Sequence, residues 1–240
     1  MPSLDRIDEV YVLDLGASRN VFNPEFVGAV SAALDEVVAS PPPRGLVTTG
    51  SGEFFSFGFD LEWIASNPDG VGDLVADVHE LVARLLELPA PTVAALQHHT
   101  FAGGSLLALA HDYRVMREDR GFFGLPEVDV RIAFTQGMTD LVKARLAPQV
   151  AHEALTSGRR YTGQEAHAAG IVDELAGAEE VVPAAIAKAK RLGGKDPATY
   201  GAIKANLYRE TLAGLRDPGV RSTDRDRFKF AIELWKQAST

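Results

Sequence analysis

Hydrophobic residues in the first part of the chain follow two periodicities that alternate. Short β-rich runs predict strands at Glu9–Leu15, Arg44–Thr49, Pro91–Leu96, Asp112–Met116 and Ile171–Leu175. Apolar residues at helical spacing predict amphipathic helices over Phe26–Ala39 and Gly72–Leu88. Strands that alternate with helices are typical of βαβ units, so the expected fold class is α/β with a largely parallel sheet.

From about Glu179 onward the pattern predicts helices alone. The predicted helices are Val181–Leu192, Pro197–Leu215 and Asp224–Gln237. We therefore expect a core over residues 1–178 and a C-terminal helical region over residues 179–240. Such a region either caps its own sheet or packs against other subunits.

Composition and charge narrow the class of protein. A chain of 240 residues with 46% hydrophobic and 24% charged residues is typical of a globular protein with one sizeable core. The formal net charge of −9 argues against a general nucleic-acid binder. The chain has no cysteine, which excludes disulfides and thiolate metal sites. No apolar run approaches the roughly 18 residues of a membrane span. The N-terminal residues lack a signal-peptide pattern, so we expect a cytoplasmic protein with no membrane partner.

Two glycine-rich stretches carry the candidate chemistry. One runs from Ser51 to Leu61, and the other runs from Phe101 to Glu127. Each turn can aim a free backbone N–H at a ligand oxygen. Two such donors on one oxygen make an oxyanion hole, and a nearby carboxylate supplies acid–base chemistry. Together they suggest an enzyme that forms an enolate from a thioester.

Six ordered motifs resemble the enoyl-CoA hydratase/isomerase, or crotonase, family over nearly the whole chain. They are Arg19–Asn23, Phe55–Leu61, Pro91–Ala95 leading into Ala102–Ser105, Ala110–Arg114, Phe123–Val128, and Gly158–Ala166 with Gly170–Asp173. The resemblance implies a crotonase-like ββα spiral core with a C-terminal helical oligomerisation region. It also implies self-association as a trimer or hexamer, an acyl-CoA thioester substrate and a place in fatty-acid metabolism.

The same resemblance assigns the candidate site residues. The N–H groups of Phe59 and Gly103 form the oxyanion hole, and Glu127 is the catalytic carboxylate. The glycines at 58 and 103 let the backbone come close, and Gly103 precedes a helix whose dipole favours negative charge. The expected substrate-binding residues are Arg19, Phe57, Gly58, Asp60, Gly104, Leu106, Phe123 and Lys229, with Arg19 and Lys229 as candidates for the CoA phosphates.

The residue pair at positions 106 and 127 distinguishes between reactions. Family hydratases use two glutamates, but Leu106 occupies the first position and only Glu127 occupies the second. A single carboxylate in an apolar pocket walled by Phe57, Phe59, Leu106 and Phe123 suits a proton shuttle. We therefore expect isomerisation of 3-enoyl-CoA to 2-enoyl-CoA, with CoA as part of the substrate and with no separate cofactor.

Two other functions remain open. A hydratase or another thioester-enolate enzyme would recruit Glu62 or Asp129 as a second acid. A catalytically silent acyl-CoA-binding protein would keep only the fold and the assembly. Departures from the family pattern bear on the acyl pocket: Arg131 stands where Gly is usual, Phe134 where Pro is common, and Gln97-His98 where Asn-Gly is common.

Several residues have simpler structural interpretations. Asp60 is expected to cap a helix that begins at Leu61. His98 and His99 are adjacent and point to opposite sides of an extended strand, so no metal site is expected. A Ser105–His111 hydrolase pair is not expected, because their spacing places them about 240° apart around a helix.

Overall fold

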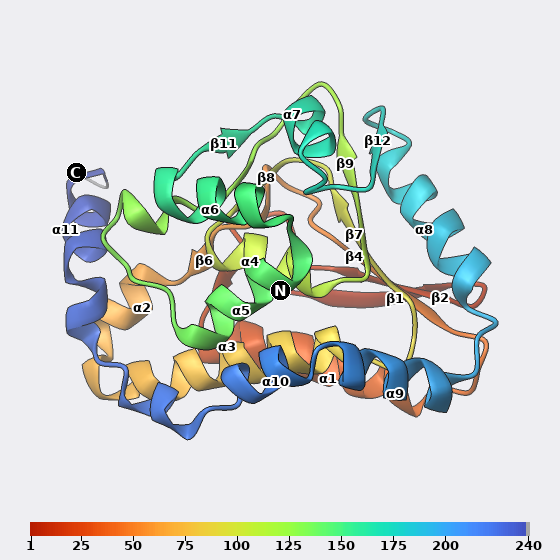
Figure 1. The fold of residues 1–240 in the computed structure, drawn as a ribbon, viewed down its shortest axis with the longest axis horizontal. Coiled ribbons are helices and arrows are strands. Elements are labelled where there is room, and N and C mark those ends of the chain that lie inside the picture. The colour runs from red at the N-terminus through yellow and green to blue at the C-terminus, as the bar shows by residue number, and fades with distance from the viewer. Residues whose placement is uncertain (239–240) are drawn as a thin grey trace.

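The computed structural model describes residues 1–238 as a central sheet flanked by helices (Figure 1). The six-stranded sheet has the order β1-β2-β4-β7-β9-β12. Its strands are β1 (Ser3–Ile7), β2 (Val10–Asp14), β4 (Gly45–Thr49), β7 (Thr92–Leu96), β9 (Tyr113–Arg117) and β12 (Glu174–Ala176). Only the β1–β2 pair is antiparallel. Every residue of β4 and β7 is buried, as expected for parallel strands covered on both faces.

Helices cover the two faces of this sheet differently. Helices α1 (Pro24–Ala39) and α3 (Val71–Leu86) pack together on one side, and α8 (Val181–Leu192) packs on the other (Figure 1). The α8 face carries Val181, Ala185 and Ala189, whose small side chains lie against a valine-rich sheet surface. The N-terminus of α1 is capped by Asn23, whose side chain accepts from the N–H of Phe26 at 3.0 Å.

A second group of short strands lies beside the main sheet and positions the candidate site. A four-stranded sheet of order β11-β10-β8-β5 contains β5 (Phe54–Ser56), β8 (His99–Phe101), β10 (Phe123–Gly124) and β11 (Arg160–Tyr161). A separate parallel pair joins β3 (Val21–Phe22) to β6 (Gly58–Phe59). Helix α2 (Leu61–Ser66) follows β6, and helix α4 (Gly103–Ala110) follows β8. A one-turn 3₁₀ helix, η1 (Pro68–Gly70), joins α2 to α3, and another, η2 (Pro126–Val128), follows β10.

The remaining helices wrap around the outside of the core. They are α5 (Gln136–Arg145), α6 (Pro148–Ser157), α7 (Gly163–Ala168), α9 (Pro197–Leu207), α10 (Arg209–Leu215) and α11 (Lys229–Ala238), with 3₁₀ turns η3 (Pro218–Ser222) and η4 (Arg225–Phe228). Helix α11 packs against α2, on the side of the molecule opposite α8 (Figure 1). No helix in the described range 1–238 is long and apolar enough to cross a bilayer.

Most predicted strands and helices are confirmed within a few residues, but some elements differ or were not predicted. The helix predicted over Pro197–Leu215 is interrupted at Tyr208, because packing of α10 against α5 and α3 redirects the chain. The strand predicted at Ile171–Leu175 begins only at Glu174, since Ile171 and Val172 are buried in the core with their N–H groups bonded to Ala166. Strand β1 was not predicted, because its largely exposed, polar sequence lacks a hydrophobic pattern.

Candidate active site

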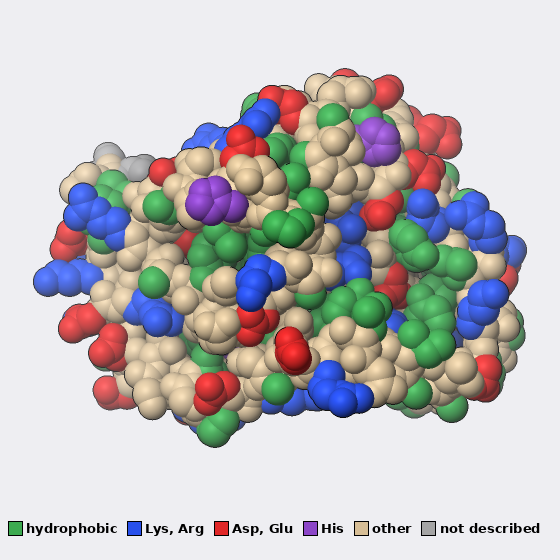
Figure 2. All heavy atoms as spheres, viewed as in Figure 1, with side chains coloured by type: hydrophobic (Ala, Val, Ile, Leu, Met, Phe, Trp, Pro, Cys, Tyr) green, Lys and Arg blue, Asp and Glu red, His purple; other side chains and the backbone are tan. Residues whose placement is uncertain are grey.

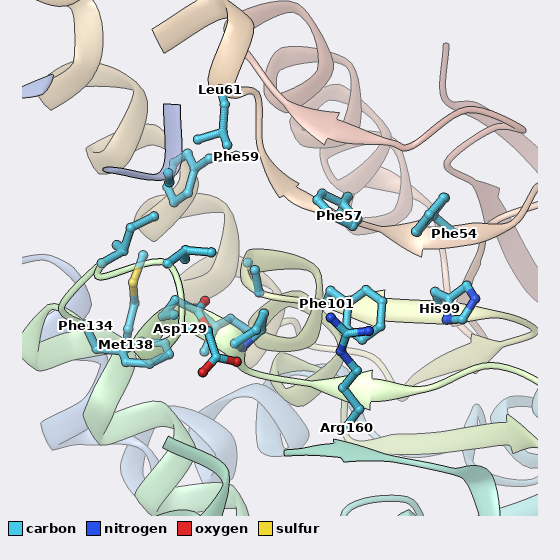
Figure 3. A pocket seen from close by; sticks show the side chains of 18 of the residues that line it. Phe54, Phe57, Phe59, Leu61, His99, Phe101, Asp129, Phe134, Met138 and Arg160 are labelled. Atoms are coloured by element: carbon cyan, nitrogen blue, oxygen red, sulfur yellow. The ribbon is translucent and has the colours of Figure 1, made fainter. Parts of the chain in front are cut away.

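A cavity of about 430 Å³ lies between β6, the start of α4, η2 and helix α11. Its walls are largely aromatic and aliphatic, and Figure 3 shows the side chains converging from several elements. The lining residues that matter below are Phe54, Phe57, Phe59, Leu61, His99, Phe101, Gly103, Leu106, Phe122, Glu127, Asp129, Ile132, Ala133, Phe134, Met138, Arg160 and Ala231.

The two glycine-rich turns predicted from the sequence touch each other at this cavity. A Cβ added at Gly58 would lie 2.8 Å from the backbone nitrogen of Gly103, and Gly58 has a φ of +86°. A side chain at position 58 would therefore collide with the second turn as well as strain the first. Only a glycine lets the β6 turn and the α4 turn approach this closely.

Both candidate donors are left without a partner in their own secondary structure. In the parallel β3–β6 pair, the N–H of Asp60 donates to the carbonyl of Phe22 at 3.1 Å. Successive N–H groups of a strand point to opposite sides, so the N–H of Phe59 points away from β3. Gly103 is the first residue of α4, and its N–H has no intrahelical acceptor. Both N–H groups are therefore free of a partner within their own strand or helix, and their joint role as an oxyanion hole stays a prediction.

Close packing holds the start of α4 in place. Ala102, immediately before Gly103, adopts φ +52° and ψ −128°, a region that non-glycine residues rarely occupy. A Cβ at Gly104 would lie 2.3 Å from the carbonyl oxygen of Ser56, so this glycine is required by the neighbouring strand. The Ser105 hydroxyl bonds to the carbonyl oxygens of Thr100 at 2.9 Å and Gly124 at 2.7 Å.

Glu127 is the buried carboxyl group of the cavity. It lies on η2, is 6% exposed, and its Oε2 has no hydrogen-bond partner within residues 1–238. Burial raises the pKa of Glu127 to about 8, and a hydrogen bond from its own backbone opposes this only partly. The backbone is fixed by the N–H of Ile132, which donates to the Glu127 carbonyl at 2.9 Å. A carboxyl group with such a pKa can both accept and return a proton near neutral pH.

The predicted substrate-binding residues differ in where they lie relative to the cavity. Phe57 and Leu106 line it. The Arg19 guanidinium lies 5.6 Å from the Phe57 ring centroid, at the cavity edge. Lys229 is exposed at the start of α11. The binding roles of these four residues remain predictions.

Two other carboxylates considered from the sequence occupy different positions. Asp60 caps α2, as predicted, because its Oδ1 accepts from the N–H of Trp63 at 2.9 Å. Glu62 lies in the first turn of α2 and does not line the cavity. Asp129 does line the cavity, but it is exposed, and its carboxylate rests against Gly158 at the end of α6.

The expectation that Phe123 walls the pocket is wrong. Phe123 is fully buried in the core, and its neighbour Phe122 lines the cavity instead. Adjacent residues of a strand point to opposite sides, and the sequence alone did not show which side faced the cavity.

His99, the second residue of the histidine pair, lines the cavity. No group of three or more potential metal ligands occurs among the described residues. His99 is instead stacked between Phe101 and Phe122, with ring centroids 5.4 and 5.6 Å away. Desolvation lowers the pKa of His99 and therefore favours the neutral ring.

Sequence reasoning also missed the contribution of α11 to the wall. Ala231 lines the cavity, and the Phe228 ring contacts Phe59 edge-on at 5.4 Å between centroids. The amphipathic pattern of residues 224–237 indicated that this helix packs against another part of the molecule, but it did not identify that part. Met138 on α5 was missed for the same reason.

The architecture described above is the crotonase fold. It matches the apo structure of an enoyl-CoA isomerase from Mtb with a TM-score of 0.84 and 28% identity, over 92% of this chain and 97% of that one. It also matches human mitochondrial delta3-delta2-enoyl-CoA isomerase with a TM-score of 0.88 over 100% of this chain and 99% of that one, although the sequences are only 22% identical.

Sequence comparison identifies the family. The sequence model of the enoyl-CoA hydratase/isomerase family matches residues 10–233. Enoyl-CoA delta isomerase 3 of Arabidopsis thaliana is 37% identical over 222 residues, which cover 88% of this chain and 93% of the relative. The chain belongs to the enoyl-CoA hydratase/isomerase family, and it is an enzyme of that family.

Proposed function

We propose that this enzyme isomerises 3-enoyl-CoA to 2-enoyl-CoA with Glu127 as the proton shuttle. The observation that carries the proposal is the single buried carboxyl group in an apolar cavity, with Leu106 where a second acid would be needed for hydration. The isomerase name of the Arabidopsis relative supports the same reaction.

The proposed steps conserve protons and electrons. The carboxylate of Glu127 removes a proton from C2, and the electron pair moves onto the thioester oxygen to give a dienolate. The N–H groups of Phe59 and Gly103 stabilise this oxyanion, an interaction typically worth about 2.7–4 kcal/mol per donor. The protonated Glu127 then returns the proton at C4, which leaves the double bond between C2 and C3.

The walls of the cavity favour proton return over the addition of water. Leu106 is 2% exposed and cannot position a water molecule, and Phe59 and Phe134 line the same space. Exclusion of water also keeps the carboxyl group desolvated, which is the cause of its raised pKa.

The alternative functions differ in what they require. A hydratase needs a second acid, and Asp129 is the better placed candidate because it lines the cavity whereas Glu62 does not. A silent acyl-CoA-binding protein would have no use for a buried, unpaired carboxyl group, which costs folding free energy.

The proposal includes a substrate that carries its own CoA, no further cofactor, and a cytoplasmic location. It also includes self-association as a trimer or hexamer through the C-terminal helices. Two large apolar residues of α9 support such assembly, because Ile203 is 60% exposed and Leu207 is 69% exposed. Figure 2 shows hydrophobic side chains gathered between α8 and α9, while charges of both signs are scattered over the rest of that face.

A spectrophotometric assay with a 3-enoyl-CoA tests the reaction, because the conjugated 2-enoyl product absorbs where the substrate does not. Glu127→Gln is expected to lower the rate by about 10²–10⁴-fold, which is the usual contribution of a positioned base. Asp129→Asn and Glu62→Gln serve as matched controls and should retain activity.

The alternatives give different results in the same assay. Full activity of Glu127→Gln with loss in Asp129→Asn would move the base to Asp129. Hydration of 2-enoyl-CoA without isomerisation would establish a hydratase. Binding of both thioesters without turnover would establish a silent binder.

A further inference from the structure

The two ends of the cavity differ in chemistry (Figure 3). One end is lined by apolar side chains, namely those of Leu61, Phe134, Met138 and Ala231. The other end holds His99 and Arg160 among phenylalanines, and Arg19 lies on the neighbouring Phe57 ring. A CoA thioester joins a polyanion to a hydrocarbon chain. The arginine-bearing end therefore suits CoA, and the apolar end suits the acyl chain.

Helix α11 covers the apolar end and contacts both of its walls. The 3₁₀ turn η4, which leads directly into α11, places Phe228 against Phe59 on one side, with ring centroids 5.4 Å apart. On the other side, the Arg131 guanidinium carbon lies 3.9 Å from the centroid of the Phe230 ring. Ala231, the next residue, faces the cavity between these two contacts.

The Arg131–Phe230 contact lies next to a segment that lines the apolar end of the cavity. Arg131 follows η2 and adopts φ +57°, and the three residues after it, 132–134, all line the cavity. If a longer acyl chain extends between Ala231 and this segment, the segment and α11 have to separate, which would break the Arg131–Phe230 contact.

We propose that the Arg131–Phe230 contact limits the depth of the acyl end and so selects short acyl chains over long ones. This inference rests on the proposed function, because it takes an acyl-CoA as the occupant. It assigns Arg131 and Phe230 to substrate selection and gives neither residue a part in proton transfer. Catalysis of a short substrate is expected to survive their replacement.

Arg131→Gly is the most informative variant. Glycine adopts φ +57° without strain, so the variant loses the guanidinium while the backbone conformation becomes easier to maintain. Phe230→Leu removes the ring and keeps an apolar side chain. Phe228 and Ile232 remain buried in both variants and hold α11 in place. Arg6→Ala is the matched control, because Arg6 also lies over an aromatic ring, that of Tyr11, but far from the cavity.

The measurement is kcat/KM for 3-dodecenoyl-CoA divided by kcat/KM for 3-hexenoyl-CoA. Because an exposed cation–π contact changes an equilibrium by about two- to fivefold, the ratio should rise by about that factor in Arg131→Gly and in Phe230→Leu. The double variant should show no further rise, because both substitutions remove the same contact. Arg6→Ala should leave the ratio unchanged.

Two results would overturn the inference: an unchanged ratio in both variants, or an equal loss for both substrates. If the wild-type enzyme converts neither thioester, the proposed function fails. The selection of chain length is then measured by calorimetric binding of butanoyl-CoA and dodecanoyl-CoA. A Kd ratio that shifts towards the longer thioester in Arg131→Gly supports the inference, and an unchanged Kd ratio overturns it.

Discussion

At the scale of single residues, the position of Glu127 determines its acid–base properties without help from a charged neighbour. Desolvation alone raises its pKa, and the only opposing influence is a hydrogen bond from its own backbone. Asp129, two residues away, is exposed and does not contribute to the shift. The carboxyl group therefore remains largely protonated at neutral pH in the free enzyme, and its basic form becomes abundant only near pH 8.

This pKa predicts the pH dependence of isomerisation. A base must be deprotonated to act, so kcat/KM should rise about tenfold per pH unit below the pKa and level off above about pH 8. Initial rates with a 3-enoyl-CoA over a series of buffers give the profile, and kcat/KM reports the pKa of the free enzyme. A profile that is already level from about pH 6 upward would show that Glu127 ionises normally or is not the base.

At the scale of elements, the carbonyl oxygen of Gly124 joins the two halves of the candidate site. It accepts from the N–H of Ala102 at 3.0 Å and from the Ser105 hydroxyl at 2.7 Å. Gly124 lies on β10, three residues before Glu127, and Ala102 directly precedes Gly103. The same hydroxyl also bonds to Thr100 on β8. These bonds fix the start of α4 relative to the segment that carries the carboxyl group.

Ser105→Ala is therefore expected to disturb positioning rather than binding. The side chain is fully buried, so the substitution leaves carbonyl groups less satisfied and should cost about 1–3 kcal/mol of unfolding free energy. Because small displacements of reacting groups are costly, kcat should fall by about tenfold, while KM changes little. Steady-state kinetics with thermal unfolding separate the two effects.

A matched control shows whether loss of kcat merely follows loss of stability. Thr49→Val removes another buried hydroxyl, which donates to the carbonyl of Ala95 at 3.2 Å within the main sheet. It should lower stability and leave kcat unchanged. Equal losses of kcat in Ser105→Ala and Thr49→Val would assign Ser105 a purely structural role.

The elements themselves were largely predictable, and the cavity was predictable only in part. A short β-rich run such as Leu46–Thr49 favours a buried strand. The glycine at position 58 indicated that another backbone segment comes close, although the sequence did not show that the contact is with Gly103. The choice between Phe122 and Phe123 depends on strand orientation, which a two-residue strand does not reveal. Ala231 reaches the cavity through packing more than a hundred residues away in sequence, and no local pattern encodes that contact.

At the scale of the whole molecule, α11 can cover the cavity only because the helices before it are anchored to the sheet. The anchor is a buried ion pair between Lys204 of α9 and Asp112 at the start of β9, with Nζ and Oδ1 2.8 Å apart. Asp112 also accepts from the Tyr200 hydroxyl at 3.0 Å and from the N–H of Thr92 at 2.9 Å. Burial lowers the pKa of Lys204, and Asp112 opposes that shift, so the charge on Lys204 depends on Asp112.

This anchor predicts that the C-terminal helices α8 to α11 unfold together with the core. Lys204→Met leaves Asp112 buried without its cation, a loss that typically costs about 3–5 kcal/mol. We expect a single denaturant transition with a lowered midpoint in the variant, because α9 is followed directly by α10, which packs against α5 and α3. Tryptophan fluorescence follows both regions at once, since Trp63 lies on α2 and Trp235 on α11.

Lys190→Met, which breaks the exposed pair with Asp8, is the control and should leave the midpoint almost unchanged. A separate early transition in Lys204→Met would instead show that the C-terminal helices fold as an independent unit, and α11 would then leave the cavity before the core unfolds.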